Sequence, residues 1–127
     1  MASSSNSNAI ASATTFVVLN FSQFITYKLD ETNYLLWLSQ IVPILKGHEL
    51  MGIVDGSEPY PPQFLSDDED KEVQNPLYSV WIKKDQCLLS WINVTLTELV
   101  LATVYGLHTS QQVWTTLANR FASQSRS

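Results

Sequence analysis

The sequence predicts an all-α fold, a single small bundle of four main helices and one short helix behind a flexible N-terminal tail. The chain has 127 residues, of which 45% are apolar, and a chain of this size and composition can bury one core. Apolar residues recur at helical spacing in successive segments, and residues that favour helix starts stand in front of them. Because the start signals agree with the apolar periodicity, we expect helices to dominate the fold.

The N-terminal part of the chain divides into two expected regions. Residues 1–23 are expected to form a flexible tail and an extended segment, because the first 15 residues are mostly Ser, Thr, Ala and Asn with little to bury. Residues 24–127 are expected to form the helical domain.

The first helix is expected over residues 32–46. Asp30 or Thr32 can cap its start, and Gly47 can end it. Its core face is expected to carry the apolar residues at helical spacing, which are Tyr34, Trp37, Leu38, Ile41 and Leu45.

A short helix over residues 49–54 is expected next, ended by a turn at Asp55 and Gly56. Residues 57–74 hold three prolines and an acidic run, so we expect a loop there. A loop of this length in a small domain is either mobile or functional.

Three further helices are expected over residues 76–93, 97–105 and 110–123. The first has Asn75 as its cap and Pro76 at its first position. The other two follow capping-box patterns, which are Thr95 with Glu98 and Thr109 with Gln112. Lys83, Lys84, Asp85 and Gln86 are expected on the solvent side of the longest helix. We expect most of the four tryptophans to be buried together, namely Trp37, Trp81, Trp91 and Trp114.

Charge argues against several classes of partner. The net charge is −5, and five of the twelve acidic residues lie between Asp67 and Glu72. The seven basic residues are scattered, and only Lys83 and Lys84 are adjacent, whereas binding to a phosphate backbone needs a basic patch. No apolar run approaches the length of a membrane span. We therefore expect neither direct nucleic-acid binding nor a membrane partner.

No set of residues suited to catalysis or metal binding is apparent. His48 and Glu49 begin a zinc-protease pattern, but Gly52 stands where the second histidine would be. The run from Asp67 to Asp70 lacks the spacing of a calcium loop, and Cys87 is better read as a small buried apolar residue. We expect no enzyme activity, no cofactor and no small-molecule substrate.

Seven blocks in order resemble the N-terminal Gag region of plant copia-type retrotransposons. They cover much of residues 24–127 and are Lys28–Trp37, Gly47–Gly56, Pro61–Leu65, Asn75–Trp81, Asp85–Ile92, Val113–Leu117 and Arg120–Arg126. The resemblance implies a helical lobe like the N-terminal lobe of a capsid protein, which associates with itself into particles around the element's RNA.

The same resemblance sets the expected partners. Gag proteins of this family normally continue into a second helical lobe and often a zinc knuckle, and this sequence stops at Ser127 before either. The resemblance thus implies a structural, self-associating domain that meets RNA only through regions absent here. The alternative is a host-retained Gag-derived module that binds another protein.

A self-association face is expected on the outer side of the first helix, at Leu36, Gln40 and Pro43. The core stripe of that helix faces the other way, which leaves Leu36 as an apolar residue on a solvent-facing side. We expect a cytoplasmic location. A plastid is the alternative if the Ser-rich start acts as a transit peptide.

Overall fold

The computed structural model describes residues 21–125, so residues 1–20 of the tail and extended segment expected over residues 1–23 lie outside the described residues. Residues 21–23 begin a short 3₁₀ helix instead of an extended segment. Nine elements follow one another along these described residues: η1 (Phe21–Phe24), α2 (Tyr34–Gly47), α3 (Met51–Asp55), β1 (Phe64–Ser66), β2 (Glu72–Gln74), α4 (Pro76–Val94), α5 (Glu98–Val104), α6 (Ser110–Arg120) and α7 (Ala122–Ser125). The fold is mostly helical, and each of the five expected helices is found within a few residues of its expected bounds.

A small antiparallel sheet corrects the expectation of an all-α fold. β1 pairs with β2, with Phe64 opposite Gln74 and Leu65 opposite Val73. The Asp67 carboxylate accepts hydrogen bonds from the backbone N–H groups of Glu69, at 2.9 Å, and Lys71, at 2.8 Å, and so closes the turn. Three-residue strands are too short to show an alternating pattern, which is why residues 57–74 read as a loop.

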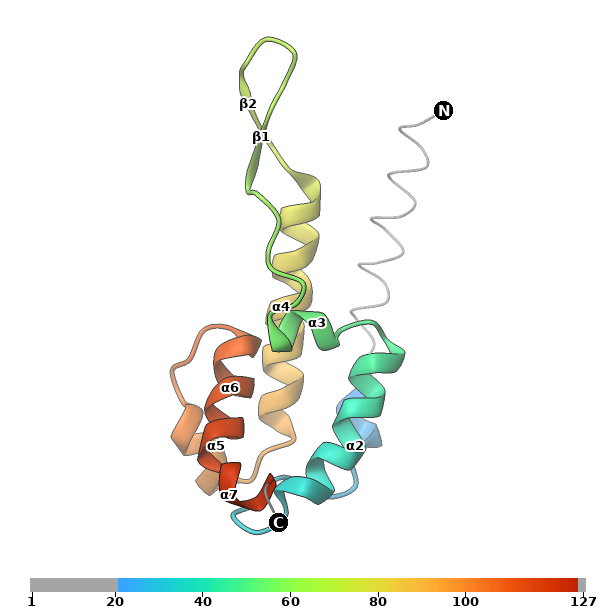
Figure 1. The fold of residues 1–127 in the computed structure, drawn as a ribbon, viewed down its shortest axis with the longest axis vertical. Coiled ribbons are helices and arrows are strands. Elements are labelled where there is room, and N and C mark those ends of the chain that lie inside the picture. The colour runs from blue at the N-terminus through green and yellow to red at the C-terminus, as the bar shows by residue number, and fades with distance from the viewer. Residues whose placement is uncertain (1–20, 126–127) are drawn as a thin grey trace.

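The elements form a helical lobe and a projecting arm (Figure 1). In the lobe, α6 packs against α3, α4 and α5, while α2 packs against α3 and α7. The first half of α4 extends beyond the lobe, with residues 57–63 and the hairpin beside and above it. We call residues 57–84 the arm.

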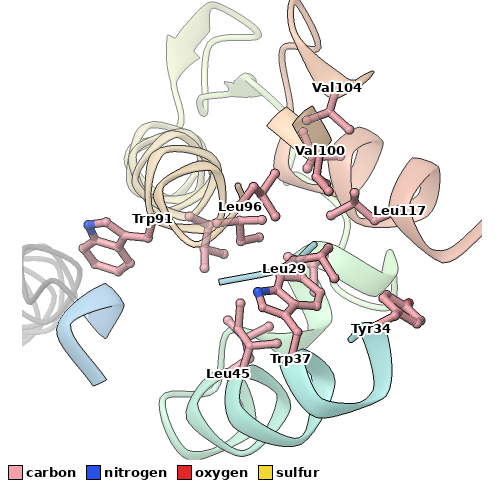
Figure 2. Packing of buried hydrophobic residues seen from close by; sticks show 14 of the residues in the cluster. Leu29, Tyr34, Trp37, Leu45, Trp91, Leu96, Val100, Val104 and Leu117 are labelled. Carbon is pink, nitrogen blue, oxygen red and sulfur yellow. The ribbon is translucent and has the colours of Figure 1, made fainter. Parts of the chain in front are cut away.

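The core lies where α2, α3, α5 and α6 meet the second half of α4. Trp37 points into its centre, close to Leu29 (Figure 2), and is fully buried. Its indole N–H donates to the Thr95 hydroxyl at 3.0 Å. Leu29 also forms an isolated parallel bridge with Leu96, which ties the chain before α2 to the chain after α4. The other fully buried large side chains are Ile41, Leu45, Leu50, Ile53, Leu88, Ile92 and Leu117.

The expectation that most of the tryptophans are buried together is met in part, because Trp37 and Trp91 belong to the buried core whereas Trp81 and Trp114 are only partly buried against it. Trp37 contacts Trp114, with ring centroids 5.6 Å apart, but Trp91 points away toward the first described segment of the chain (Figure 2). Trp81 is only partly buried and lies on the arm beside Tyr60, at 5.9 Å between ring centroids.

Two of the expected caps are confirmed. The Asn75 side chain accepts from the backbone N–H of Leu77, with Pro76 at the first helical position. Thr109 and Gln112 form a complete capping box at the start of α6. In both cases the sequence pattern and the local geometry agree.

Two other expected caps are wrong. Thr95 ends α4 instead of starting α5, because its hydroxyl donates to the Ile92 carbonyl at 2.6 Å and accepts from Trp37. The cap of α5 is Thr97, whose hydroxyl donates to the Leu29 carbonyl. The first helix is capped at Asn33, and neither Asp30 nor Thr32 takes that position.

Candidate interaction surfaces

The predicted face on α2 is partly occupied by the chain itself. Leu36 is 48% exposed and Pro43 is exposed, as expected. Gln40 is half-buried, because its carbonyl oxygen accepts from the backbone N–H groups of Thr26 and Tyr27 at 2.8 and 3.0 Å. Its amide also donates to the Tyr27 carbonyl. Gln40 therefore holds the segment before α2 in place, and the free apolar part of this face is Leu36, Pro43 and the neighbouring Leu35.

The arm carries a second apolar surface that the sequence reasoning missed. Its exposed large apolar side chains are Tyr60, Phe64, Leu65, Val73 and Leu77. Tyr60 and Leu77, at 66% and 60%, are both more exposed than Leu36. The three prolines and the length of the loop were the signals that could have indicated an ordered, functional segment.

A groove of about 270 Å³ lies at the base of the arm. It is lined by Glu58, Pro59, Pro61, Leu77, Val80, Trp81 and Lys84. The Trp81 indole N–H donates to the Glu58 carbonyl at 3.0 Å, and the Asn75 amide donates to the Pro62 carbonyl at 2.8 Å. These bonds hold residues 58–62 along α4, so the groove is part of the ordered fold.

The two ends of the arm carry opposite charge. The tip, residues 67–72, holds five carboxylates and Lys71, which lies 3.3 Å from Glu69 in an exposed ion pair. The lower end holds Lys83, which is exposed, and Lys84, which is half-buried against the groove.

Asp85 follows these lysines but does not belong to this surface. It is 1% exposed, so the expectation that it faces solvent is wrong. Its carboxylate accepts from the backbone N–H and the hydroxyl of Ser110, at 3.0 and 2.6 Å. The start of α6 supplies these donors, and they satisfy a charge that would otherwise be buried without partners.

The C-terminal turn closes onto the start of α2. The Tyr34 ring stacks on Phe121, with centroids 5.2 Å apart, and the Arg120 guanidinium donates to both oxygens of Glu31. The Gln124 side chain accepts from the backbone N–H of Tyr34 and donates to the Glu31 carbonyl. The first and last of the resembling blocks therefore meet in space.

Two titrating groups in this region are shifted by their surroundings. Hydrogen bonds from the backbone N–H and hydroxyl of Thr32 lower the pKa of Asp30. Burial raises the pKa of Tyr34. Hydrogen bonding accounts for the first shift and burial for the second.

The residues considered for metal binding are not brought together. Within residues 21–125 no group of three or more His, Cys, Asp or Glu side chains could hold a metal ion. The His48 ring nitrogen Nδ1 lies 2.9 Å from the Ile44 carbonyl at the end of α2, and Cys87 is half-buried on α4. Among the same residues, no helix has the length and apolar character needed to cross a membrane.

Comparison with known proteins indicates where the sequence originates. No family model matches the chain, and no solved structure matches it. It is 35% identical over 108 residues to the retrovirus-related Pol polyprotein from transposon RE2 of Arabidopsis thaliana. It is 33% identical over 108 residues to the corresponding polyprotein from transposon RE1 of the same plant. Each match covers 85% of this chain, but the chain spans only about 7% of the length of these relatives. The similarity supports a retrotransposon origin.

Proposed function

Taking the chain as retrotransposon-derived, we propose that it is a structural, self-associating domain of the Gag or capsid type, without enzyme activity. It belongs to an element or to a remnant of one. Two findings support the proposal. The relatives are transposon polyproteins of which this segment is a small part, and the segment folds as a mostly helical lobe with apolar side chains left on its surface.

The observation that carries the proposal is the exposed apolar surface on a domain poor in charge. Only 15% of the residues are charged, against about a quarter in ordinary domains. Leu35 and Leu36 are consecutive residues of α2, and about half of each is exposed. A small apolar patch supports weak association, and repetition in a lattice raises the overall affinity without new contacts.

The proposal also concerns which part of a Gag protein binds RNA. The described surface offers scattered basic residues and an acidic arm tip, so this segment is proposed to contribute protein contacts only. Element RNA would be held by other regions of a longer Gag protein. A cytoplasmic location fits such assembly, with the plastid as the alternative.

Sedimentation equilibrium of the wild type and of a Leu36→Glu variant tests the α2 face. A glutamate at this exposed position leaves the fold intact and places a charge in an apolar contact, so association should weaken. Leu99→Glu, at an exposed position on α5, is the matched control. Identical profiles for the wild type and Leu36→Glu would remove Leu36 from the interface.

A second function is favoured by the groove on the arm. Its size suits one or two apolar side chains of another protein, so a host-retained module that binds a different partner is the alternative. A wild type that stays monomeric at every concentration would favour this alternative over the Gag-type function.

A further inference from the structure

We propose that the arm is a self-complementary docking surface, on which a second copy of this chain lies antiparallel. The acidic tip of each arm meets Lys83 and Lys84 of the other arm, and the apolar side chains between the two ends pack together. This inference rests on the proposed self-association and assigns it a surface distinct from the α2 face.

The first step is the apolar surface of the arm. Phe64, Leu65 and Val73 are all at least 43% exposed, although they belong to paired strands. A two-stranded hairpin is marginally stable by itself in water, and its outer edges offer unpaired backbone groups. The hairpin stands clear of the lobe (Figure 1), and nearly half of the surface of each of these residues is left exposed. A partner that covers them would stabilise the hairpin.

The second step is the separation of charge along the arm. Five carboxylates and Lys71 leave a net charge of −4 on residues 67–72, and the rest of the chain is close to neutral. Two tips placed side by side would repel each other. An antiparallel arrangement removes this repulsion, because it puts each tip at the lower end of the other arm.

The third step is the charge that each tip would meet. Lys83 and Lys84 are the only adjacent basic residues in the sequence, and Lys84 lines the groove. Asp85 does not lie on this surface, because its carboxylate is buried and turned toward Ser110 at the start of α6. Glu58 also lines the groove, so the surface groups at the lower end of the arm are two lysines and one carboxylate.

The occupant is a second copy because both complementary charges lie on the same arm, on either side of the stretch that carries the exposed apolar side chains. Of the hairpin residues, Leu65 and Val73 are paired and share one face, whereas Phe64 lies on the other. In a two-fold contact every pairing between the two copies occurs twice. The tip of the first copy therefore meets the lysine pair of the second, and the tip of the second meets the lysine pair of the first. A basic peptide from another protein would satisfy the tip but would leave the lysine pair and the groove without a matching charge.

Charge reversal at each end tests the arrangement. The tip variant carries Asp68→Lys, Glu69→Lys and Glu72→Lys; it keeps Asp67, which closes the turn, and Asp70, which has a positive φ of 58°. The base variant carries Lys83→Glu and Lys84→Glu. Four of the five positions are exposed and Lys84 is half-buried at the groove, so the circular dichroism spectrum of each variant checks the fold.

Each variant alone should associate at least about tenfold more weakly than the wild type by sedimentation velocity, because like charges then meet at both ends. An equimolar mixture of the two variants should regain the wild-type affinity as a mixed dimer. A single chain with all five substitutions should regain it as well. Wild-type association should weaken as salt is raised.

The outcomes separate this proposal from the proposed function. If the wild type associates and both variants associate with the same affinity as the wild type, the arm contact is overturned and self-association through α2 remains. Weakening in both variants without rescue in the mixture also overturns it, since the tip and the lysines then do not face each other. A wild type that is monomeric at all concentrations contradicts both proposals.

Discussion

Asp85 illustrates how a single buried charge organises the lobe. Its neighbours Lys83, Lys84 and Gln86 are polar, which favoured a solvent-facing position. The helical spacing from Asp85 to Leu88 and Ile92 nevertheless places all three on one buried face. The carboxylate is tolerated there because the N-terminus of α6 supplies two donors from Ser110. Residue type alone could not reveal this, since the donors come from a segment 25 residues away.

Removing the Asp85 carboxylate should destabilise the fold strongly. Asp85→Ala leaves the donors of Ser110 buried without an acceptor, and we expect the free energy of unfolding to fall by about 2–3 kcal/mol. Asp85→Asn keeps an acceptor oxygen and should lose less. Asp68→Ala, at the exposed tip, is the matched control and should change little. Urea unfolding of the three variants checks this, and equal losses for Asp85→Ala and Asp68→Ala would contradict the capping role.

Tyr34 should make the protein sensitive to alkaline pH. Burial raises the pKa of its hydroxyl, so the unfolded chain loses this proton first as the pH rises. Its contribution to stability is therefore complete below the usual pKa of about 10 and is lost as the pH rises through the raised value. Urea midpoints measured from neutral to strongly alkaline pH should fall less steeply for Tyr34→Phe than for the wild type.

The control for this measurement is Tyr105→Phe, because Tyr105 is 88% exposed. This variant should keep the wild-type slope. If Tyr34→Phe keeps it too, the Tyr34 hydroxyl is not held in a buried environment.

The helices were predictable because local and tertiary signals agree in them. Asn75 with Pro76, and Thr109 with Gln112, cap helices whose apolar faces also repeat at helical spacing. Thr95 was misassigned because a capping-box pattern also fits a helix C-terminus, where its hydroxyl bonds Ile92 and Trp37. The choice depends on a contact with α2, which the local sequence does not contain.

The hairpin and the groove were not predictable in the same way. Strands of three residues carry almost no periodic signal, and the turn depends on the Asp67 side chain. In the sequence, that aspartate looks like one member of an acidic run. On the predicted α2 face, helical spacing predicted the exposure of Leu36 and Pro43, whereas the contacts of Gln40 with residues 26 and 27 are tertiary.

The closure of the C-terminal turn onto α2 should depend on stacking more than on charge. Phe121→Ala removes a buried ring and should lower the free energy of unfolding by about 3–5 kcal/mol. Glu31→Gln breaks an exposed ion pair with Arg120, and such pairs contribute about 0–1 kcal/mol. Thermal unfolding of both variants at low and high salt measures the difference. A larger loss for Glu31→Gln than for Phe121→Ala would reverse this order.

The whole molecule separates a packed, nearly neutral lobe from a projecting arm with an acidic tip (Figure 1). Buried tertiary contacts account for the lobe. They do not account for the exposed apolar side chains of the arm and of α2, which lie outside the core. We interpret both surfaces as contacts between copies of the chain, which is the property that a Gag-type lobe requires.

Sedimentation equilibrium of the wild-type chain over a wide range of concentration therefore decides the account. We expect the weight-average mass to start at the 14.3 kDa of one chain and to rise reversibly with concentration. The rise should be smaller for Leu36→Glu, for the tip variant and for the base variant than for the wild type. A mass that stays at one chain across the whole range would contradict a self-associating function for this domain.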